Sequence, residues 1–365
     1  MKDSVAVIGA GTSGLILAKG LAQLGIDVTV YDQKEVLGSP VRASGILSIN
    51  GLRSLGIEYE EAVTNTLYGA TIHANKRSMH VESEEPKAHV LERHALNEIC
   101  RKEAEMQGAK IILKRKINNS DLEELSKESI IVGADGAVSS VASYFKMGPI
   151  KEYLLTYRAE YKGDVENARS VDLFFDKSIT PGFFGWLCPD STDTLEVAVG
   201  ISPSAGNAKA AFERFTRSGS MKGILGGYAF AGGMASMIPI GMRRRMADSK
   251  KEVLLVGDAA GQVKPSTGGG IIYGGNGAMM AAHAIYNYIK HGEGLEAYEK
   301  AYRKRYGKEL MLHSAIHKAY AGLGGEGMGI AIDIFIALGV DGFLGRHGDM
   351  DMPSLMLKRL FLRRG

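Results

Sequence analysis

The chain has 365 residues, of which 45% are hydrophobic, 44 are basic and 41 are acidic. That length favours two joined domains, and a net charge of only +3 gives no indication of a nucleic-acid partner, which would require a basic stripe. The two cysteines, Cys100 and Cys188, are too few for an iron–sulfur cluster, which takes about four, and they favour a reducing, cytoplasmic setting.

A βαβ unit of roughly 30 residues opens the chain. Ser4–Ile8 is short, apolar and rich in β-branched residues, which is typical of a buried parallel strand. The turn Gly9–Gly14 (GAGTSG) follows, and then Leu15–Leu24 predicts a helix and Asp27–Tyr31 a second strand. Because the first strand begins at once, no signal peptide is predicted, and no uninterrupted run of about 18 apolar residues predicts a membrane span.

Short apolar strands of this buried, parallel type are interrupted by a region of antiparallel strands and then occur again. Core-type strands are predicted at 110–113, 129–132 and 253–256, antiparallel ones at 170–175, 185–188 and 195–201, and helices at 95–107, after 270 and from 295 onward. The predicted fold class is therefore α/β, with a Rossmann-like nucleotide-binding domain of the glutathione-reductase type. This domain would comprise residues 1–66, 88–150 and 237–292. An inserted antiparallel β-sheet for the substrate would comprise 67–87 and 151–236, and a C-terminal helical region 293–365.

The glycines of the first turn have separate tasks in a dinucleotide site. Gly9 permits the tight turn, Gly11 lets the backbone approach a pyrophosphate, and Gly14 lets the helix pack on the strand. The pyrophosphate then lies at the helix N-terminus, where free N–H groups and the helix dipole favour an anion. Asp32, at the end of the second strand, is placed to accept hydrogen bonds from an adenosine ribose. The same cofactor site is predicted to include Ser13 and Gln33.

A second element, some 250 residues later, favours FAD over NAD. Asp258 follows a strand in the segment LLVGDAAG, and the glycines around Gly269 and Gly270 lead into a long helix at Ile271. An NAD dehydrogenase has no need of this distant element, whereas an extended FAD reaches far from its adenine. Asp258 would bind the ribityl or pyrophosphate region, and the N–H groups of 268–271 would face the flavin N1–C2=O edge.

Six segments carry a resemblance to a known family: GAGTSG (9–14), GSPVRASG (38–45), VLERHALNEI (90–99), GADGAVSS (133–140), PGFFGWLCP (181–189) and GDAAGQVKPSTGGGI (257–271). In this order they resemble the geranylgeranyl reductase family of flavoproteins, within the p-hydroxybenzoate-hydroxylase-like fold. The resemblance implies FAD as cofactor. It also implies FAD contacts at Arg42, Ala43, Ser44, Arg93, Asp135 and Gly136, with Ile117 near the adenine.

The segment PGFFGWLCP resembles the family's PxxYxWxFP motif, with Phe184 in place of Tyr and Cys188 in place of Phe. In the family this strand lines the lipid cavity, and aromatic side chains suit an isoprenoid chain. An ordinary core strand is the alternative interpretation. Phe184, Trp186, Cys188 and Tyr273 are the predicted substrate contacts.

One departure from the family concerns catalysis. Many members carry a catalytic Cys at the position of Ala43, whose methyl group can neither ionise nor transfer a proton. No catalytic residue is therefore assigned. Cys188 could supply a thiol from the opposite wall, but a buried, inert cysteine is the favoured interpretation, as it is for Cys100.

The resemblance implies an FAD-dependent reductase that saturates geranylgeranyl-type double bonds of a lipid or lipid precursor by hydride transfer from reduced flavin. Its electron donor would be a ferredoxin or NAD(P)H. An aromatic monooxygenase and a non-catalytic electron-transfer protein stay as alternatives. A flavin halogenase is disfavoured, because the single tryptophan cannot form the W-x-W-x-I-P motif typical of that class.

Two further features of the C-terminal region leave alternatives open. No metal site is predicted, since the spaced pair His313 and His317 is interpreted as a surface pair on a helix. The segment 354–365 carries four basic residues and no acidic one. It is either a helix packed on the body with its basic side chains in water, or a tail that makes peripheral contact with an anionic membrane surface.

Overall fold

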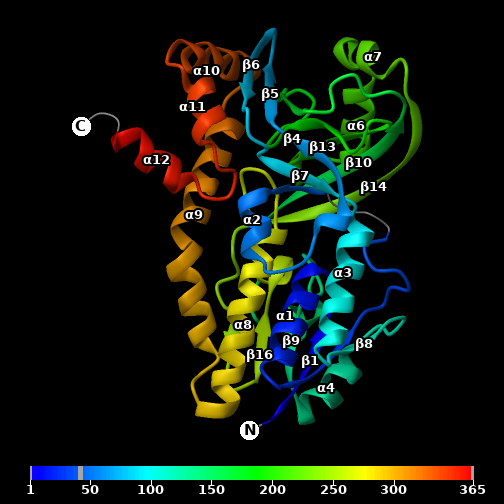
Figure 1. Ribbon diagram of the computed structural model, residues 1–365, viewed down its shortest axis with the longest axis vertical. Helices are drawn as coiled ribbons and strands as arrows, with labels where there is room; N and C mark the ends of the chain where they lie inside the picture. Colours follow the sequence, from blue (N-terminus) through cyan, green and yellow to red (C-terminus); the bar gives the residue numbers. More distant parts are fainter. Residues whose placement is uncertain (1, 40–43, 363–365) are drawn as a thin grey trace.

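Two large β-sheets organise the chain in the computed structural model, which describes residues 2–39 and 44–362, the last three by backbone alone (Figure 1). The first sheet has the strand order β15 (Ala247–Asp248), β16 (Val253–Leu255), β9 (Ser129–Gly133), β1 (Ser4–Ile8), β2 (Asp27–Tyr31) and β8 (Lys110–Ile112). All its pairs are parallel except the hairpin of β15 with β16. The predicted Rossmann-like α/β core is therefore confirmed.

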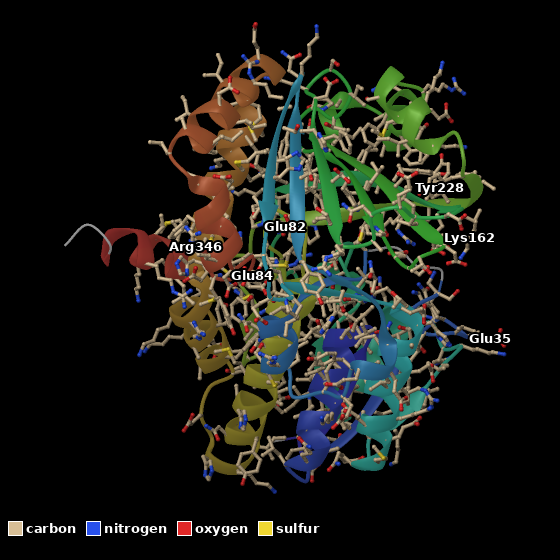
Figure 2. The ribbon with its side chains drawn as sticks, turned by 45° about the horizontal axis from the view of Figure 1, so that its top comes forward. Glu35, Glu82, Glu84, Lys162, Tyr228 and Arg346 are labelled. Carbon is tan, nitrogen blue, oxygen red and sulfur yellow. The ribbon has the colours of Figure 1, made fainter. Side chains whose placement is uncertain are left out.

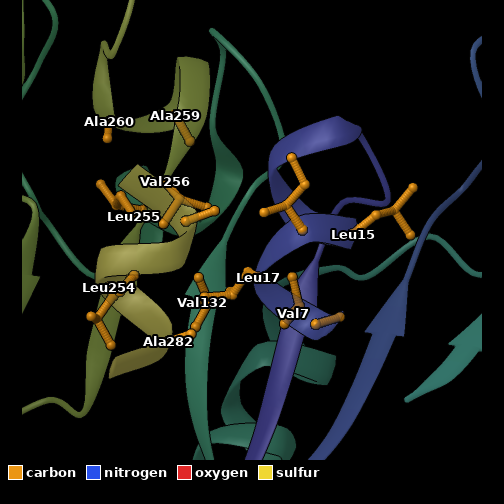
Figure 3. Packing of buried hydrophobic residues seen from close by; sticks show 14 of the residues in the cluster. Val7, Leu15, Leu17, Val132, Leu254, Leu255, Val256, Ala259, Ala260 and Ala282 are labelled. Atoms are coloured by element: carbon orange, nitrogen blue, oxygen red, sulfur yellow. The ribbon is translucent and has the colours of Figure 1, made fainter. Parts of the chain in front are cut away.

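The core of this half lies between the six-stranded sheet and three helices, α1 (Thr12–Gln23), α3 (Arg93–Met106) and α8 (Ile271–His291). Figure 3 shows Val7 and Val132 of the sheet beside Leu17 of α1 and Ala282 of α8. A Cβ atom on Gly20 would lie 3.1 Å from that of Ala282, so α1 and α8 pack closely. The short strands are apolar on both faces because helices α4 (Asn119–Glu128) and α5 (Ser140–Tyr144) also contact β9.

The second sheet has seven strands: β14 (Ala229–Ile240), β10 (Glu152–Lys162), β13 (Thr194–Ile201), β12 (Gly185–Pro189), β11 (Ser170–Phe175), β5 (Gly69–Ala74) and β6 (Arg77–Glu82). The predicted inserted antiparallel sheet is confirmed apart from one pair, since β5 and β11 run parallel. These two strands come from separate excursions of the chain out of the first sheet, and such a crossover, unlike a hairpin, allows parallel pairing. Helices α6 (Ala208–Thr216) and α7 (Gly219–Leu225) lie on this half.

A small sheet joins the halves, with the order β3 (Ile46–Ser48), β7 (Ala88–Leu91) and β4 (Val63–Leu67). The short helix α2 (Ile49–Ser54) follows β3 directly, and the Ser48 side chain caps it by accepting a hydrogen bond from the Gly51 N–H. Residues 44–48, which follow the loop that resembles the family's flavin loop, are thereby held at the junction between the two large sheets.

The C-terminal region is helical, as predicted: α9 (Glu296–Gly322), α10 (Gly325–Ala337), α11 (Val340–His347) and α12 (Pro353–Leu362). Helix α9 runs beside α8 and reaches the seven-stranded sheet, where α10 and α11 cover β5 and β6 (Figure 1). Within the described residues no single helix has the length and apolar character of a membrane span. The bent pair of α10 and α11, with 75° between the two helices, meets that criterion only jointly.

The prediction of a surface histidine pair on α9 is wrong for His313. Its side chain is 3% exposed, and its Nδ1 atom lies 2.6 Å from the Ser266 hydroxyl. His317 is partly buried and contacts the Gly182 carbonyl through Nε2 at 2.9 Å. Both histidines face the body of the protein because α9 packs against it along its length.

Candidate functional site

The first turn has the geometry that a pyrophosphate requires. Gly9 adopts φ +111°, and a Cβ atom there would lie 2.3 Å from the Ala134 carbonyl oxygen, so only glycine fits. A Cβ atom on Gly14 would come within 2.1 Å of the Gly9 carbonyl oxygen, which explains the close packing of helix on strand. At Gly11, by contrast, a Cβ atom would meet no protein atom within 4 Å, so this position faces open space at the N-terminus of α1.

Asp32 lies at the end of β2 beside the same turn. One carboxylate oxygen accepts a hydrogen bond from the Ala10 N–H at 2.8 Å, and the other accepts one from the Lys34 N–H at 2.8 Å. These bonds fix the carboxylate next to the glycine turn and leave further lone pairs for a ribose hydroxyl. Gln33 follows it on the surface, whereas Ile117 is buried in the core, 7% exposed.

The two distant motifs meet in space. A Cβ atom on Gly257 would lie 2.8 Å from the Ser13 hydroxyl oxygen, and one on Gly274 would lie 2.5 Å from it, so α1 and α8 approach each other through these small residues. Asp258 lies against the start of α8, where its Oδ1 atom would be 2.8 Å from a Cβ atom on Gly270. The sequence prediction that both motifs serve one extended site is therefore supported by their proximity.

Arg93 brings a buried positive charge to this site. One guanidinium nitrogen, Nη2, donates to the Thr12 hydroxyl at 3.3 Å, while the other, Nη1, is buried and has no partner within the described residues. Burial lowers the pKa of Arg93 and raises that of Asp258, and the charge of each opposes the shift of the other. An unpaired buried N–H on a cation is costly, and an anionic or carbonyl-rich cofactor would satisfy it.

Asp135 and Gly136 form a tight turn at the end of β9. The Asp135 carboxylate accepts hydrogen bonds from the Ser139 hydroxyl at 2.6 Å and from the Ser140 N–H at 2.7 Å, and so holds the start of α5. Gly136 has φ +85° and open space where a side chain would stand. Asp135 therefore shapes the turn, and it is the backbone at Gly136 that is free to approach a ligand.

The N-terminus of α8 is built for an anion. No side chain caps it, so its first N–H groups are left for another partner. Gly268 reaches φ +75°, and the loop is closed by hydrogen bonds from the Lys264 N–H to the Gly269 carbonyl and from the Gly268 N–H to the Lys264 carbonyl. The residues around this site thus fit the negative edge of a flavin.

An aromatic wall adjoins the site on the side of the seven-stranded sheet. Phe183 and Phe184 stack at 4.1 Å between ring centroids, Phe184 meets Trp186 edge to face at 5.8 Å, and Tyr320 of α9 contacts Phe175 at 5.2 Å. The Trp186 N–H donates to the Ser44 hydroxyl at 3.1 Å. This bond connects the wall to residues 44–48 at the junction of the two large sheets, which we name the junction loop. We name Phe175, Phe183, Phe184, Trp186 and Tyr320 the aromatic wall.

Of the other predicted substrate contacts, Cys188 lies in a small cluster that packs against Trp186, and Tyr273 lies in the core of the first half. Cys188 is fully buried against Leu67, Ala88 and Val90, and burial raises its pKa well above the ordinary value. Cys100 is also buried, and its pKa rises to about 12 for the same reason. Tyr273 is 1% exposed in the core of the first half, where its hydroxyl donates to the Asp351 carbonyl at 2.5 Å. Contact of Cys188 and Tyr273 with substrate stays a prediction.

Sequence reasoning missed a buried charged network behind the wall. Glu196 has no exposed surface, and it accepts from the Trp186 N–H at 2.7 Å, from Arg158 Nε at 2.7 Å and from the Ser44 hydroxyl. Asp190 belongs to the same network, because its Oδ2 atom lies 3.8 Å from Arg158 Nη2. Burial together with the Glu196 charge raises the pKa of Asp190 to about 8. The sequence does contain one indication of this network: Glu196 is the one charged residue inside the otherwise apolar strand Thr194–Ile201. The predicted contacts Arg42 and Ala43 lie outside the described residues.

Comparison with known proteins places the chain among FAD-dependent oxidoreductases. Residues 2–311 match the family model of the FAD binding domain, and the chain belongs to this family. FAD is its cofactor. An uncharacterised protein of Methanocaldococcus jannaschii is 28% identical over alignments covering 98% of this chain and 94% of that protein. A digeranylgeranylglycerophospholipid reductase of Methanothermobacter thermautotrophicus is 29% identical, with 84% and 83% covered.

A solved structure has the same fold. The geranylgeranyl bacteriochlorophyll reductase-like protein of Thermoplasma acidophilum has a TM-score of 0.82 at 20% identity, with 97% of this chain and 94% of that one covered. The resemblance to the geranylgeranyl reductase family, first given by six short segments, is thus confirmed over most of the chain.

Proposed function

We propose that this oxidoreductase saturates isoprenoid double bonds of a geranylgeranyl-type lipid or lipid precursor. The observation that carries the proposal is the aromatic wall, which stands beside the FAD site and is tied to it by the hydrogen bond from Trp186 to Ser44. Aromatic side chains offer an apolar surface with few polar demands, which suits a long polyene better than a small polar substrate. The names of the similar reductases support the same substrate class.

The residues of the chain would divide the work as follows. When bound and reduced, FAD would supply a hydride for one alkene carbon, and a proton would be needed at the other; two electrons from a donor and one proton would then be required to reduce the cofactor again. Gly11, Ser13, Arg93, Gly136 and Asp258 would hold the cofactor, and the N-terminus of α8 would favour its reduced, negative form. The aromatic wall would orient the polyene and exclude water.

We further propose that Asp190 is the source of the proton. Burial and the negative charge of Glu196 raise the pKa of Asp190, which favours the protonated carboxyl. Arg158 holds Asp190 and Glu196 together, and Glu196 in turn accepts from the Ser44 hydroxyl at the junction loop. This network would replace the thiol that Ala43 cannot supply.

The electron donor is proposed to be a ferredoxin or NAD(P)H. A hollow of about 1030 Å³ on the FAD-binding half is lined by six basic side chains, among them Lys146, Arg244 and Lys300, and by three acidic ones, Asp248, Glu296 and Glu299. The excess of positive charge would favour a donor with an acidic surface. Reduction of the FAD by ferredoxin and by NAD(P)H, each tested alone, separates the two donors. A donor that docks at this basic hollow should reduce the FAD more slowly as the ionic strength rises.

One experiment tests the reductase directly. Protein reduced without oxygen is mixed in a stopped-flow instrument with a geranylgeranyl lipid, and flavin reoxidation is followed with product analysis by mass. Reoxidation coupled to a gain of two hydrogens per double bond supports the proposal. Reoxidation that requires oxygen and yields a hydroxylated product would instead establish the monooxygenase alternative.

A further inference from the structure

Helix α10 is apolar on the side that faces away from the protein. Five large side chains on or directly after it are solvent-exposed: Ile330 (51%), Ile334 (51%), Phe335 (42%), Ile336 (44%) and Leu338 (72%). At 100° per residue all of them except Ile336 span about 140° of one side of the helix, and we name these four residues the α10 face. A surface helix of a globular protein normally carries polar residues on this side.

The opposite side of α10 packs on the protein at Gly329 and Ile332, whereas Ile336, one turn further along, is 44% exposed. Ile332 is 1% exposed and packs on Ala74 and Met79 of the β5–β6 hairpin, while Gly329 lies against Arg77. Helix α11 continues over the same hairpin, and Figure 2 marks this junction by Arg346 on α11 and Glu82 at the end of β6. The α10 face therefore cannot be satisfied by rotation of the helix, which would expose Ile332 instead.

The α10 face is also electrically neutral. Asp333 is the only charged residue between Gly327 and Leu338, and its carboxylate is paired with Arg77 Nε at 2.6 Å. Attraction between this face and a partner must therefore be hydrophobic, with little dependence on salt.

The beginning of α10 adjoins the aromatic wall. A narrow cleft of about 10 Å³, with room for roughly one water molecule, is lined by Phe183, Tyr320, Leu323 and Met328. Phe183 and Tyr320 belong to the aromatic wall, and Leu323 and Met328 flank the start of α10. The cleft, whose lining also includes Asp176, Lys177 and Thr180, is too small for a polyene, but it shows that the start of α10 lies beside the aromatic wall.

We propose that the α10 face docks on the surface of a lipid bilayer, with the helix lying along the interface. The proposal rests on the proposed function in one respect, that the substrate is a lipid. Four side chains with these exposed fractions offer at most roughly 300–550 Å², the sum obtained if each presented the 150–250 Å² of an aromatic side chain. A stable dimer needs about 800 Å² per partner, so a second copy is the poorer occupant. Interfacial binding has no such threshold, because it grows with the apolar area inserted.

The test uses the full chain with FAD bound and vesicles of pure phosphatidylcholine, which carry no net charge. Ile330→Ser, Ile334→Ser and Leu338→Ser are combined in one variant. The matched control combines Met106→Ser, Ile112→Ser and Met311→Ser, which are exposed to a similar extent elsewhere on the protein. We expect the wild type and the control to sediment with the vesicles equally at low and high salt. The α10 variant should lose about a hundredfold in partition coefficient.

Three outcomes would overturn docking by this face. They are a wild type that does not bind neutral vesicles, an α10 variant that binds as well as the control, or a wild-type dimer that the α10 substitutions convert to a monomer. Binding only to anionic vesicles and only at low salt would assign the contact to the basic segment of α12. Reduction of a detergent-dispersed isoprenoid lipid is measured in parallel. Vesicle binding without any such reduction would end the reductase proposal and leave the docking proposal standing.

Discussion

The Nζ atom of Lys264 lies 2.5 Å from the Oδ1 atom of Asp351, with both side chains buried. Lys264 stands in the loop before α8, and a Cβ atom on Gly269 would lie 3.0 Å from its Cε atom. Asp351 comes from the segment after α11. It also accepts from the Ser48 hydroxyl, and its carbonyl oxygen contacts Tyr273 and His313. Asp351 therefore connects four parts of the chain: the junction loop, the loop that precedes α8, helix α8 itself and helix α9.

Breaking this pair should loosen the FAD site. Asp351→Asn leaves Lys264 as a buried, unpaired cation, and such losses typically cost about 3–5 kcal/mol. We expect a lower melting temperature and weaker FAD affinity, measured by thermal unfolding and by titration of the apoprotein. The double variant Lys264→Met/Asp351→Asn should recover part of the stability. Lys2→Met, which breaks the partly exposed pair with Glu252 far from the loop, serves as control; an equal effect there would show that the loop has no special role.

Gly11→Val should abolish FAD retention without unfolding the protein. The backbone at Gly11 has φ −73° and ψ 170°, which any residue adopts, and a Cβ atom there meets no protein atom. The only group that the new side chain would displace is the bound pyrophosphate. Absorbance of the purified protein near the flavin bands and circular dichroism measure the two effects. Gly14→Val should instead impair folding, because its side chain would overlap the Gly9 carbonyl oxygen. If Gly11→Val retains FAD, the glycine turn does not bind the pyrophosphate.

Arg93→Ala should weaken FAD binding by about 1.5–3 kcal/mol, the range for hydrogen bonds to charged groups. The guanidinium nitrogen Nη1 has no partner within the described part of the chain, so its contribution should appear mainly when the cofactor is bound. FAD titration and the melting temperature of the apoprotein separate the two states. If the apoprotein is destabilised as much as the complex, Arg93 is a structural residue.

Acidification should destabilise the protein through His313. Burial and the Lys264 charge lower its pKa from 6.5 to about 4, so the unfolded chain binds a proton more readily. The stability contributed by the neutral imidazole is present above about pH 6.5 and is lost as the pH falls toward 4. Asp190 contributes the opposite slope over the same range, so urea unfolding is compared between wild type and His313→Gln. Stability of the variant should fall less on acidification than that of wild type, and equal slopes for the two proteins would show that His313 does not contribute.

Raising the pH should destabilise the protein through Asp190, whose contribution has the opposite pH dependence to that of His313. Its pKa is raised from 3.8 to about 8, so the folded protein holds a proton that the unfolded chain releases. Stability from the neutral carboxyl is complete below about pH 4 and declines as the pH rises to 8. Asp190→Asn should remove this decline and, if Asp190 supplies the proton, should lower turnover while leaving FAD affinity unchanged. A turnover equal to wild type would exclude that role.

Local patterns predicted the fold well where contacts are local in sequence. The βαβ unit from Ser4 to Tyr31 has its strands where the apolar runs placed them, because both faces of such strands are buried. The parallel pair of β5 with β11 was not predicted, since nothing in either segment encodes a partner about 100 residues away. For the same reason the sequence did not predict the ion pair of Lys264 with Asp351 or the burial of His313. The packing of α9, and not the neighbouring residues in sequence, sets the environments of these side chains.

The strand order of the first sheet has a consequence for how the protein is made. β1 pairs with β9, and β9 pairs with β16, so the ladder is completed only when Leu255 has left the ribosome. Until then β9 presents an unpaired edge, and the glycine turn after β1 lacks the Gly257–Ile271 segment that completes its site. FAD can therefore act as a folding ligand only late in synthesis, and chains that stop before Val253 should aggregate in preference to binding the cofactor.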